Sequence, residues 1–513
     1  MNRRLTLAVW LLLAFVATVC PVGAQIAPPS PAAGVVGQGV EAVFDTINTT
    51  AVDPKAQIRY MPDNMTSWYA RWAIMDNAKK SIDTTYFIFE QDVFGYSMMG
   101  LLLKKAREGI NIRIMMDARG TKGLTRKLQG QDVMQELAKF PNVHIKTYNA
   151  VHSRLFEAFD DLRKIMASNH DKIICVDGQY LITGGRNISK NYFVDPSDLA
   201  TVYRDTDILI NSPVVAAEAK LAFDEEFGSG SACNFSIGNE WFGNIDDMHR
   251  TLDIAYHSMR RYMMGMGVNK IDPSKFSKET VKLVESYTNE LLTYKKLTGF
   301  SSFRLFDGQH SYPTRILDKN SLAGFRNDIT NNLFALMDAC KSEIIIQNPY
   351  VVLTPGAEAA LQRASDRGVR IIIQTNSPMS SDSLLTQALF VGDWKNILKK
   401  MPKVEIYAYK LTTKLHSKTF VFDRKIAVIG TYNMDYVSEQ INSEMVAVVK
   451  GPAFAEQVAR RIGEDMKNSF RYEIKVKADG TVETVFGPES HSDPKVLSRL
   501  NLLLKLQWLR PII

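Results

Sequence analysis

The chain has 513 residues, of which 45% are hydrophobic, with 62 Lys and Arg against 55 Asp and Glu. This composition is typical of a globular protein and excludes a disordered or fibrous one. One hydrophobic core rarely serves more than roughly 250 to 300 residues, so we expect at least two domains.

The start of the chain is typical of a secretory signal peptide. A basic start precedes an apolar run over residues 5–19, and small residues at 22–24 fit a cleavage site. The run is shorter than the roughly twenty residues that span a bilayer, which favours cleavage after residue 24. An uncleaved anchor is the alternative. We therefore expect an exported protein, periplasmic or secreted. A linker is expected over residues 25–44, in which 26–39 are rich in Pro, Ala and Gly, and the folded part should start near residue 40.

The net charge and the cysteines that remain after residue 24 limit the kinds of protein this can be. Residues 1–24 hold Arg3 and Arg4 and no acid, so their removal lowers the net charge from +7 to +5. That excess is too small for a dedicated nucleic-acid binder, although local basic patches can still meet phosphate or an anionic membrane. Cys175, Cys233 and Cys340 form an odd, sparse set that predicts no disulfide framework.

Helix and strand patterns alternate along the chain and then recur. Residues 68–81 predict a helix, 81–89 a strand, 95–108 a helix and 110–117 a strand. The same order returns as a helix over 333–342, a strand over 343–347, a helix over 356–367 and a strand over 369–373. This alternation predicts an α/β fold, and its recurrence indicates an internal duplication.

A motif that carries chemistry repeats with the fold. His170, Lys172 and Asp177 form HxKxxxxD, followed after six residues by Gly184 and then by Asn187. All five positions recur 246 residues later, as His416, Lys418, Asp423, Gly430 and Asn433. Five positions at one constant offset favour a functional site over chance. The alternative is a pair of ordinary hairpins with solvated His and Lys.

The residue types suit phosphate chemistry. On a strand, side chains alternate, so His170 and Lys172 share one face and Asp171 points away. An ammonium group repels a cation but holds an oxyanion, while imidazole can attack phosphorus or donate a proton. Two such sets could perform a double displacement on a phosphodiester. We therefore expect neither a metal nor another cofactor.

The two motifs resemble those of the phospholipase D superfamily, and the resemblance covers most of residues 55–513. Residues 184–193, 430–435 and 442–445 are similar to those of bacterial cardiolipin synthases, particularly the C-type branch. The resemblance implies an α/β fold of two fused phospholipase D-like repeats, packed with pseudo-twofold symmetry around one active site. His170 would form a phosphohistidine, and His416 would protonate the leaving alcohol and then activate the acceptor.

The resemblance also assigns the other site residues. The predicted catalytic set is His170, Lys172, Asp177, His416, Lys418 and Asp423, although the two aspartates lie at turns, where a structural role is favoured. The residues expected to bind the substrate phosphate are Asn187, Asn433, Gly184 and Thr431. Asp207 and Glu444 are the matching positions for carboxylates that orient the histidines.

The implied substrate is a phospholipid such as phosphatidylglycerol at a membrane surface, with water or an alcohol as acceptor. An exported start is unusual for this branch, which leaves two alternatives open. One is a secreted, metal-independent nuclease of the same superfamily, and the other is a catalytically silent membrane-binding protein. Lipid is favoured over nucleic acid, and the sequence does not indicate an oligomeric state.

We expect the first repeat over residues 45–232 and the second over 311–475. A helical connecting region over 233–310, with helices at 246–264 and 277–296, is expected to cover the core rather than to form a lid. Residues 476–513 predict a hairpin and a basic amphipathic helix. That helix is equally suited to lying on an anionic bilayer and to docking on the protein itself.

Overall fold

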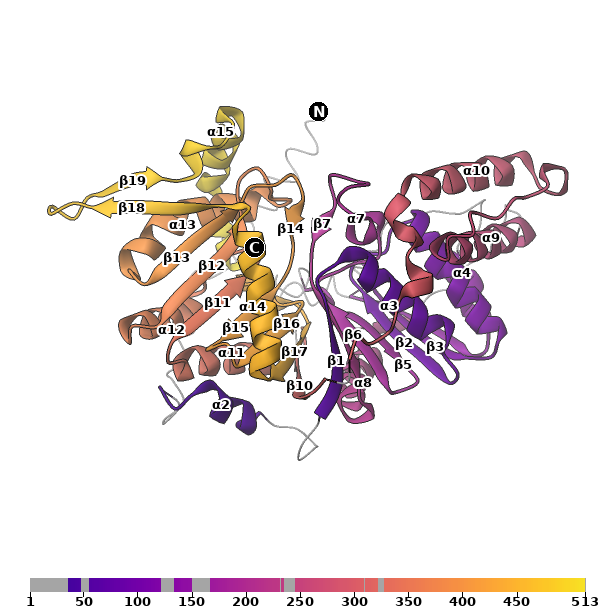
Figure 1. Ribbon diagram of the computed structural model, residues 1–513, viewed down its shortest axis with the longest axis horizontal. Helices are drawn as coiled ribbons and strands as arrows, with labels where there is room; N and C mark the ends of the chain where they lie inside the picture. Colours follow the sequence, from indigo (N-terminus) through magenta and orange to yellow (C-terminus); the bar gives the residue numbers. More distant parts are fainter. Residues whose placement is uncertain are drawn as a thin grey trace.

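The computed structural model describes residues 36–47, 55–120, 133–149, 167–230, 232–234, 245–308, 310–321 and 327–512. The expected signal peptide and most of the expected linker lie outside these ranges. Within them, no helix is both long and apolar enough to cross a membrane. The chain forms two α/β halves that lie side by side, with the first half in indigo and magenta and the second in orange and yellow (Figure 1).

The first half is built on a mixed sheet with the strand order β9-β4-β3-β2-β5-β6-β8-β1. β2, β3 and β4 are parallel, whereas the later strands are antiparallel to their neighbours. The strands are β1 (Lys55–Met61), β2 (Ser81–Tyr86), β3 (Asn111–Asp117), β4 (Val143–Tyr148), β5 (Lys172–Val176), β6 (Tyr180–Gly184), β8 (Asp207–Asn211) and β9 (Ala232–Asn234).

The second half repeats this order as β18-β13-β12-β11-β15-β16-β17-β10, with β19 added outside β18. Its strands are β10 (Ser311–Lys319), β11 (Glu343–Gln347), β12 (Arg370–Asn376), β13 (Val404–Tyr409), β15 (Thr419–Phe422), β16 (Ile426–Gly430), β17 (Glu444–Lys450), β18 (Ser469–Val476) and β19 (Val482–Phe486).

The two sheets meet at a short antiparallel pairing of β1 with β10, over residues 55–57 and 311–313. Counted outward from this junction, the equivalent strands follow in the same order in each half. The two halves are therefore related by pseudo-twofold symmetry. A hydrophobic core shared by both halves lies beside the junction and includes Ile208 and Ile210 with Ile429 and Ala447. The fold predicted from the repeated pattern is therefore confirmed.

Helices cover the sheets on both sides of the junction. The first half contributes α3 (Asn64–Asp76), α4 (Val93–Arg107), α5 (Val133–Ala138), α7 (Lys190–Phe193) and α8 (Pro213–Gly228). The second half contributes α11 (Asp328–Ala339), α12 (Pro355–Asp366), α13 (Leu384–Lys400) and α14 (Pro452–Met466). α8 and α14 are equivalent, and buried residues of both, such as Val215 and Val458, belong to the shared core.

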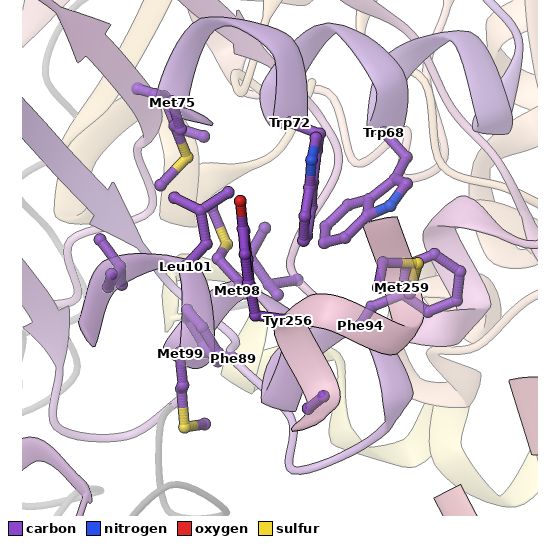
Figure 2. Close-up of a cluster of buried hydrophobic side chains, with 14 of the residues drawn as sticks. Trp68, Trp72, Met75, Phe89, Phe94, Met98, Met99, Leu101, Tyr256 and Met259 are labelled. Atoms are coloured by element: carbon purple, nitrogen blue, oxygen red, sulfur yellow. The ribbon is translucent and has the colours of Figure 1, made fainter. Parts of the chain in front are cut away.

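The connecting region forms α9 (Ile245–Met263) and α10 (Lys278–Thr293), with 3₁₀ turns at Pro273–Lys275, Lys295–Thr298 and Phe300–Ser302. As Figure 2 shows, Tyr256 and Met259 of α9 join the aromatic and Met side chains of α3 and α4. The rings of Trp72 and Tyr256 stack 5.4 Å apart, and the Tyr256 hydroxyl donates to Asp76. The expectation that these helices cover the core is therefore confirmed.

Two predicted boundaries are wrong. Residues 40–44 are not linker, because α2 (Val40–Thr46) packs on the second half, with Val40 and Phe44 in its core. Their apolar spacing of four residues gives the helix a buried face. The first sheet also extends beyond residue 232, because β9 pairs with β4 up to Asn234.

The C-terminal segment docks on the protein itself. After the predicted hairpin of β18 and β19 come α15 (Pro494–Leu503) and a 3₁₀ segment (Leu504–Ile512). Leu500 is buried, and Arg510 forms an ion pair with Asp393 of α13. Leu502 and Trp508 of the same segment remain exposed.

Candidate active site

The two histidines lie just before equivalent strands, β5 and β15, at the junction of the halves. The segment ahead of each histidine pairs with the opposite half. The His170 N–H donates to the Ser443 carbonyl, and the His416 N–H donates to the Arg204 carbonyl. Next to the hydrogen bond between His416 and Arg204, β14 (Lys414–Leu415) pairs in parallel with β7 (Tyr203–Arg204). Each half thus holds the backbone of the other half's histidine.

His170 is oriented by a carboxylate from the second half. Its Nδ1 lies 3.0 and 3.1 Å from the two carboxylate oxygens of Glu444, which also accepts from the Ser438 hydroxyl at 2.7 Å. Burial lowers the pKa of His170 to about 4, against the raising effect of Glu444. Burial alone would raise the pKa of Glu444, but His170 and Lys172 lower it. A neutral imidazole that donates from Nδ1 leaves Nε2 unprotonated and nucleophilic.

His416 is oriented in the same way by a carboxylate from the first half. Its Nδ1 lies 2.7 Å from Asp205 Oδ2, and both side chains are buried. Burial and then Lys418 lower the pKa of His416, whereas Asp205 raises it. Lys418 and His416 together lower the pKa of Asp205 despite its burial. Asp205 therefore stays ionised, and its carboxylate faces Nδ1 together with the Lys418 ammonium, whose Nζ lies 2.9 Å from the same nitrogen.

The structure corrects the prediction of Asp207 as the orienting residue. Asp207 instead accepts from Ser67 and forms ion pairs with Arg71 at 2.8 Å and Arg186 at 3.2 Å. The strand register explains the error. Gly184 is paired with Asp207, and the equivalent Gly430 is paired with Val446, so the true counterpart of Glu444 lies two residues before Asp207.

The two lysines share the face of their histidines, as the alternation predicted. Lys172 donates to the His170 carbonyl at 2.7 Å, and Lys418 donates to the His416 carbonyl. Burial lowers the pKa of Lys172 to about 7 and also lowers the pKa of Lys418. The charge of Lys418 lowers the pKa of both His170 and Lys172, so the two motifs act on one another across the junction.

The residues expected to bind phosphate differ in their contacts. The side-chain oxygen Oδ1 of Asn187 accepts a hydrogen bond from the Ile88 N–H, and its Nδ2 donates to the Tyr192 hydroxyl. Asn433 is buried, and its Oδ1 has no hydrogen-bond partner among the described residues. The Thr431 hydroxyl donates to the Met445 carbonyl and accepts from the Met445 N–H. Thr431 therefore supports β17 and is not directed at a phosphate.

The first half has glycines where a side chain would collide with these carboxylates. A Cβ at Gly185 would lie 2.1 Å from Asp205 Oδ1, and one at Gly184 would lie 2.1 Å from Asp207 Oδ1. Gly184 also has φ of 153°, which L side chains rarely adopt. Gly185 and Thr431 are equivalent positions, so glycine in the first half leaves room for Asp205.

Asp177 and Asp423 are turn residues and lie at the far ends of their strands from the histidines. Both have positive φ, at 56° and 49°. The Asp177 carboxylate accepts from the backbone N–H groups that lead into β2, and Asp423 accepts from those that lead into β11. Their contacts are structural, and their place in the predicted catalytic set is not supported.

Three tyrosines form an aromatic wall beside His416, which the sequence analysis did not predict. The rings of Tyr203, Tyr192 and Tyr350 meet His416 edge-on at 5.1, 5.6 and 6.3 Å. The Tyr350 hydroxyl donates to Asp382 at 2.7 Å. These residues come from separate segments and share no repeated pattern. Asp205 is identified by strand register, because it lies two residues before the partner of Gly184, just as Glu444 lies two residues before the partner of Gly430.

Known proteins match the chain over most of its length. A family model described as "Cardiolipin synthase, PLD-like domain" matches residues 72–226 and 333–466. Cardiolipin synthase C of Escherichia coli is 23% identical over 489 residues, which cover 87% of this chain and 94% of that protein. A probable cardiolipin synthase of Bacillus subtilis is 22% identical over 419 residues, or 82% of this chain and 67% of that protein.

A solved structure shares the whole fold. The phosphatidylserine synthase of Haemophilus influenzae superposes with a TM-score of 0.58 at 10% sequence identity, covering 92% of this chain and 100% of that chain. At this identity the match concerns the fold alone.

Proposed function

The chain belongs to the phospholipase D-like family of cardiolipin synthases and is an enzyme of that family, and we propose that it transfers phosphatidyl groups through a phosphohistidine on His170. The substrate is a phospholipid such as phosphatidylglycerol. A second lipid hydroxyl as acceptor gives cardiolipin or a relative of it, and water gives phosphatidic acid.

The proposed reaction has two displacements at phosphorus. In the first, Nε2 of His170 forms a bond to phosphorus and the bond to the leaving alcohol breaks, while His416, which starts as the imidazolium, donates its Nε2 proton to that alcohol. In the second, His416 takes the proton of the acceptor hydroxyl, the new P–O bond forms and the P–N bond breaks. Lys172 and Lys418 neutralise the phosphate charge that develops in both steps.

The observation that carries this proposal is the reciprocal pairing of His170 with Glu444 and of His416 with Asp205. In each pair we assign the proton on Nδ1 to the imidazole, which donates a hydrogen bond to the carboxylate and is oriented by it. Nε2 then remains for chemistry, and a nearby negative charge stabilises the imidazolium that forms at His416. The low pKa of His170 suits a nucleophile, which has to be unprotonated to attack.

We propose further that residues 1–24 direct export, so that the enzyme meets membrane lipid outside the cytoplasm. N-terminal sequencing of the protein recovered from an expressing culture tests this point. A mature chain that begins near residue 25 supports export with cleavage, whereas an intact Met1 on a membrane-bound chain supports the uncleaved anchor.

The central experiment incubates the purified chain, with chelator present, with phosphatidylglycerol vesicles and separately with single- and double-stranded DNA. Mass spectrometry follows the products. We expect cardiolipin or phosphatidic acid, neither of which should form with His170→Ala. His416→Ala should slow the breakdown of a covalent intermediate that His170→Ala never forms. Cut DNA with unchanged lipid would assign the same mechanism to a nuclease. Lipid binding without any product would indicate a silent membrane-binding protein.

A further inference from the structure

Large apolar side chains are exposed on two loops beside His416. The first loop, residues 377–383, exposes 56% of Met379 and leads into α13, whose first residue, Leu384, is 38% exposed. The second loop, residues 410–413, leads into β14 and exposes 37% of Leu411. Single exposed apolar residues are common, but a group of them around one site calls for a partner.

Both loops are linked to His416 by the aromatic wall. Asp382 of the first loop accepts from Tyr350, whose ring contacts His416. Lys414, which directly follows the second loop, lies with its Nζ 5.5 Å above the ring of Tyr203, and that ring also contacts His416. Asp382 is exposed while His416 is buried, so the contacts through Tyr350 connect the histidine with the exposed surface of the first loop.

Basic side chains accompany the apolar ones. Lys410 is exposed next to Leu411, and Lys414 is half-buried. Across the junction, the Thr412 hydroxyl contacts the Ala200 carbonyl of the first half. The carboxylate of Asp198 in that same loop accepts from the Lys296 N–H, which brings the exposed Lys295 and Lys296 beside the loops. Apolar groups set among lysines are complementary to an anionic bilayer surface.

α15, which carries another exposed apolar residue, lies on the same side of the molecule. In Figure 1, β7, β14, α10 and α15 lie along the upper side, whereas α8 lies along the lower side. The segment formed by α15 and the following 3₁₀ turns exposes 64% of Leu502 and 43% of Trp508. Trp and Leu among basic residues are typical of segments that lie in the membrane interface.

We propose that a membrane-docking rim, formed by Met379, Leu384, Lys410, Leu411 and Lys414, inserts into the interfacial layer of an anionic bilayer. This proposal rests on the proposed function, because it assumes that the substrate is a phospholipid. In this docked position the two loops beside His416 face the bilayer, so that a lipid headgroup reaches the histidines while its acyl chains stay in the membrane.

The test compares two multiple variants with the unmodified chain. In the rim variant Met379, Leu384 and Leu411 are each changed to Asp. The matched control changes Val214 and Leu221 to Asp, which are 43% and 50% exposed on α8, on the opposite side of the molecule. Sedimentation measures binding to phosphatidylglycerol and to phosphatidylcholine vesicles. Turnover is measured on phosphatidylglycerol vesicles and on monomeric dihexanoyl-phosphatidylglycerol.

We expect the rim variant to lose at least tenfold in vesicle binding and vesicle turnover, with turnover of the monomeric lipid within twofold and the control variant unchanged. Lys410→Glu should weaken binding to phosphatidylglycerol vesicles more than to phosphatidylcholine vesicles. Unchanged vesicle binding by the rim variant, or an equal loss on monomeric lipid, would overturn the rim. If the unmodified chain turned over no lipid but still bound vesicles through the rim, the proposed function would fail and the docking surface would stand.

Discussion

Replacing Asp205 by Asn tests the assignment of the carboxylate that orients His416. The two side chains are buried, and Asp205 Oδ2 lies 2.7 Å from His416 Nδ1. A hydrogen bond that involves a charged group contributes about 1.5 to 3 kcal/mol. At about 1.4 kcal/mol for each factor of ten, Asp205→Asn should slow the steps that use His416 by roughly 10- to 150-fold.

The effect should appear in a particular step. A phosphatidyl ester with a p-nitrophenol leaving group needs no protonation, so formation of the phosphohistidine should stay within about threefold. Its breakdown requires His416 as a base and should show the full loss. Rapid quenching followed by mass spectrometry of the peptide that holds His170 should therefore detect accumulated intermediate in Asp205→Asn.

Asp207→Asn is the matched control, since it changes the same residue type two positions away. Asp207 pairs with Arg71 and Arg186, and removal of one partner of a buried ion pair costs about 3 to 5 kcal/mol. This variant should have a lower Tm and should accumulate no intermediate. If Asp207→Asn accumulated the intermediate and Asp205→Asn did not, the assignment drawn from the geometry would be refuted.

Further changes test other parts of the site. Gly185→Ala should reproduce the slow breakdown of Asp205→Asn, because its Cβ would collide with Asp205; quench experiments with normal breakdown would contradict this. Asp423→Ala should cost about 1 to 3 kcal/mol of stability through lost backbone hydrogen bonds, seen as a lower midpoint in urea, while kcat of the folded fraction is kept. The pKa of His170 is about 4, so its protonation should not slow phosphohistidine formation at pH 6 but should slow it toward pH 4; an acid-side decline already centred near pH 6.5 would show that the imidazole is not depressed. Lys418→Arg should lose activity on phosphatidylglycerol vesicles, because a planar guanidinium cannot replace a compact ammonium in a buried phosphate site.

The sequence by itself determined the duplicated fold and the pairs of histidine and lysine. The constant offset between the two motifs is a property of the chain, and alternation along a strand already places His170 and Lys172 on one face. Alternating helix and strand patterns predicted the equivalent elements to within a few residues at most ends. The turn positions of Asp177 and Asp423 also indicated a structural role without any tertiary information.

Only the tertiary structure decided which groups meet across the junction. Asp205 and Asp207 are two residues apart on an extended segment, so local periodicity gives both the same face and cannot choose between them. The choice follows from strand register and from packing of the two halves, which join His416 to Asp205 over 211 residues and His170 to Glu444 over 274. The same holds for α2, an N-terminal helix that packs on the second half, and for the aromatic wall. Contacts at such separations are fixed by burial of the shared core, and no local pattern in the chain encodes them.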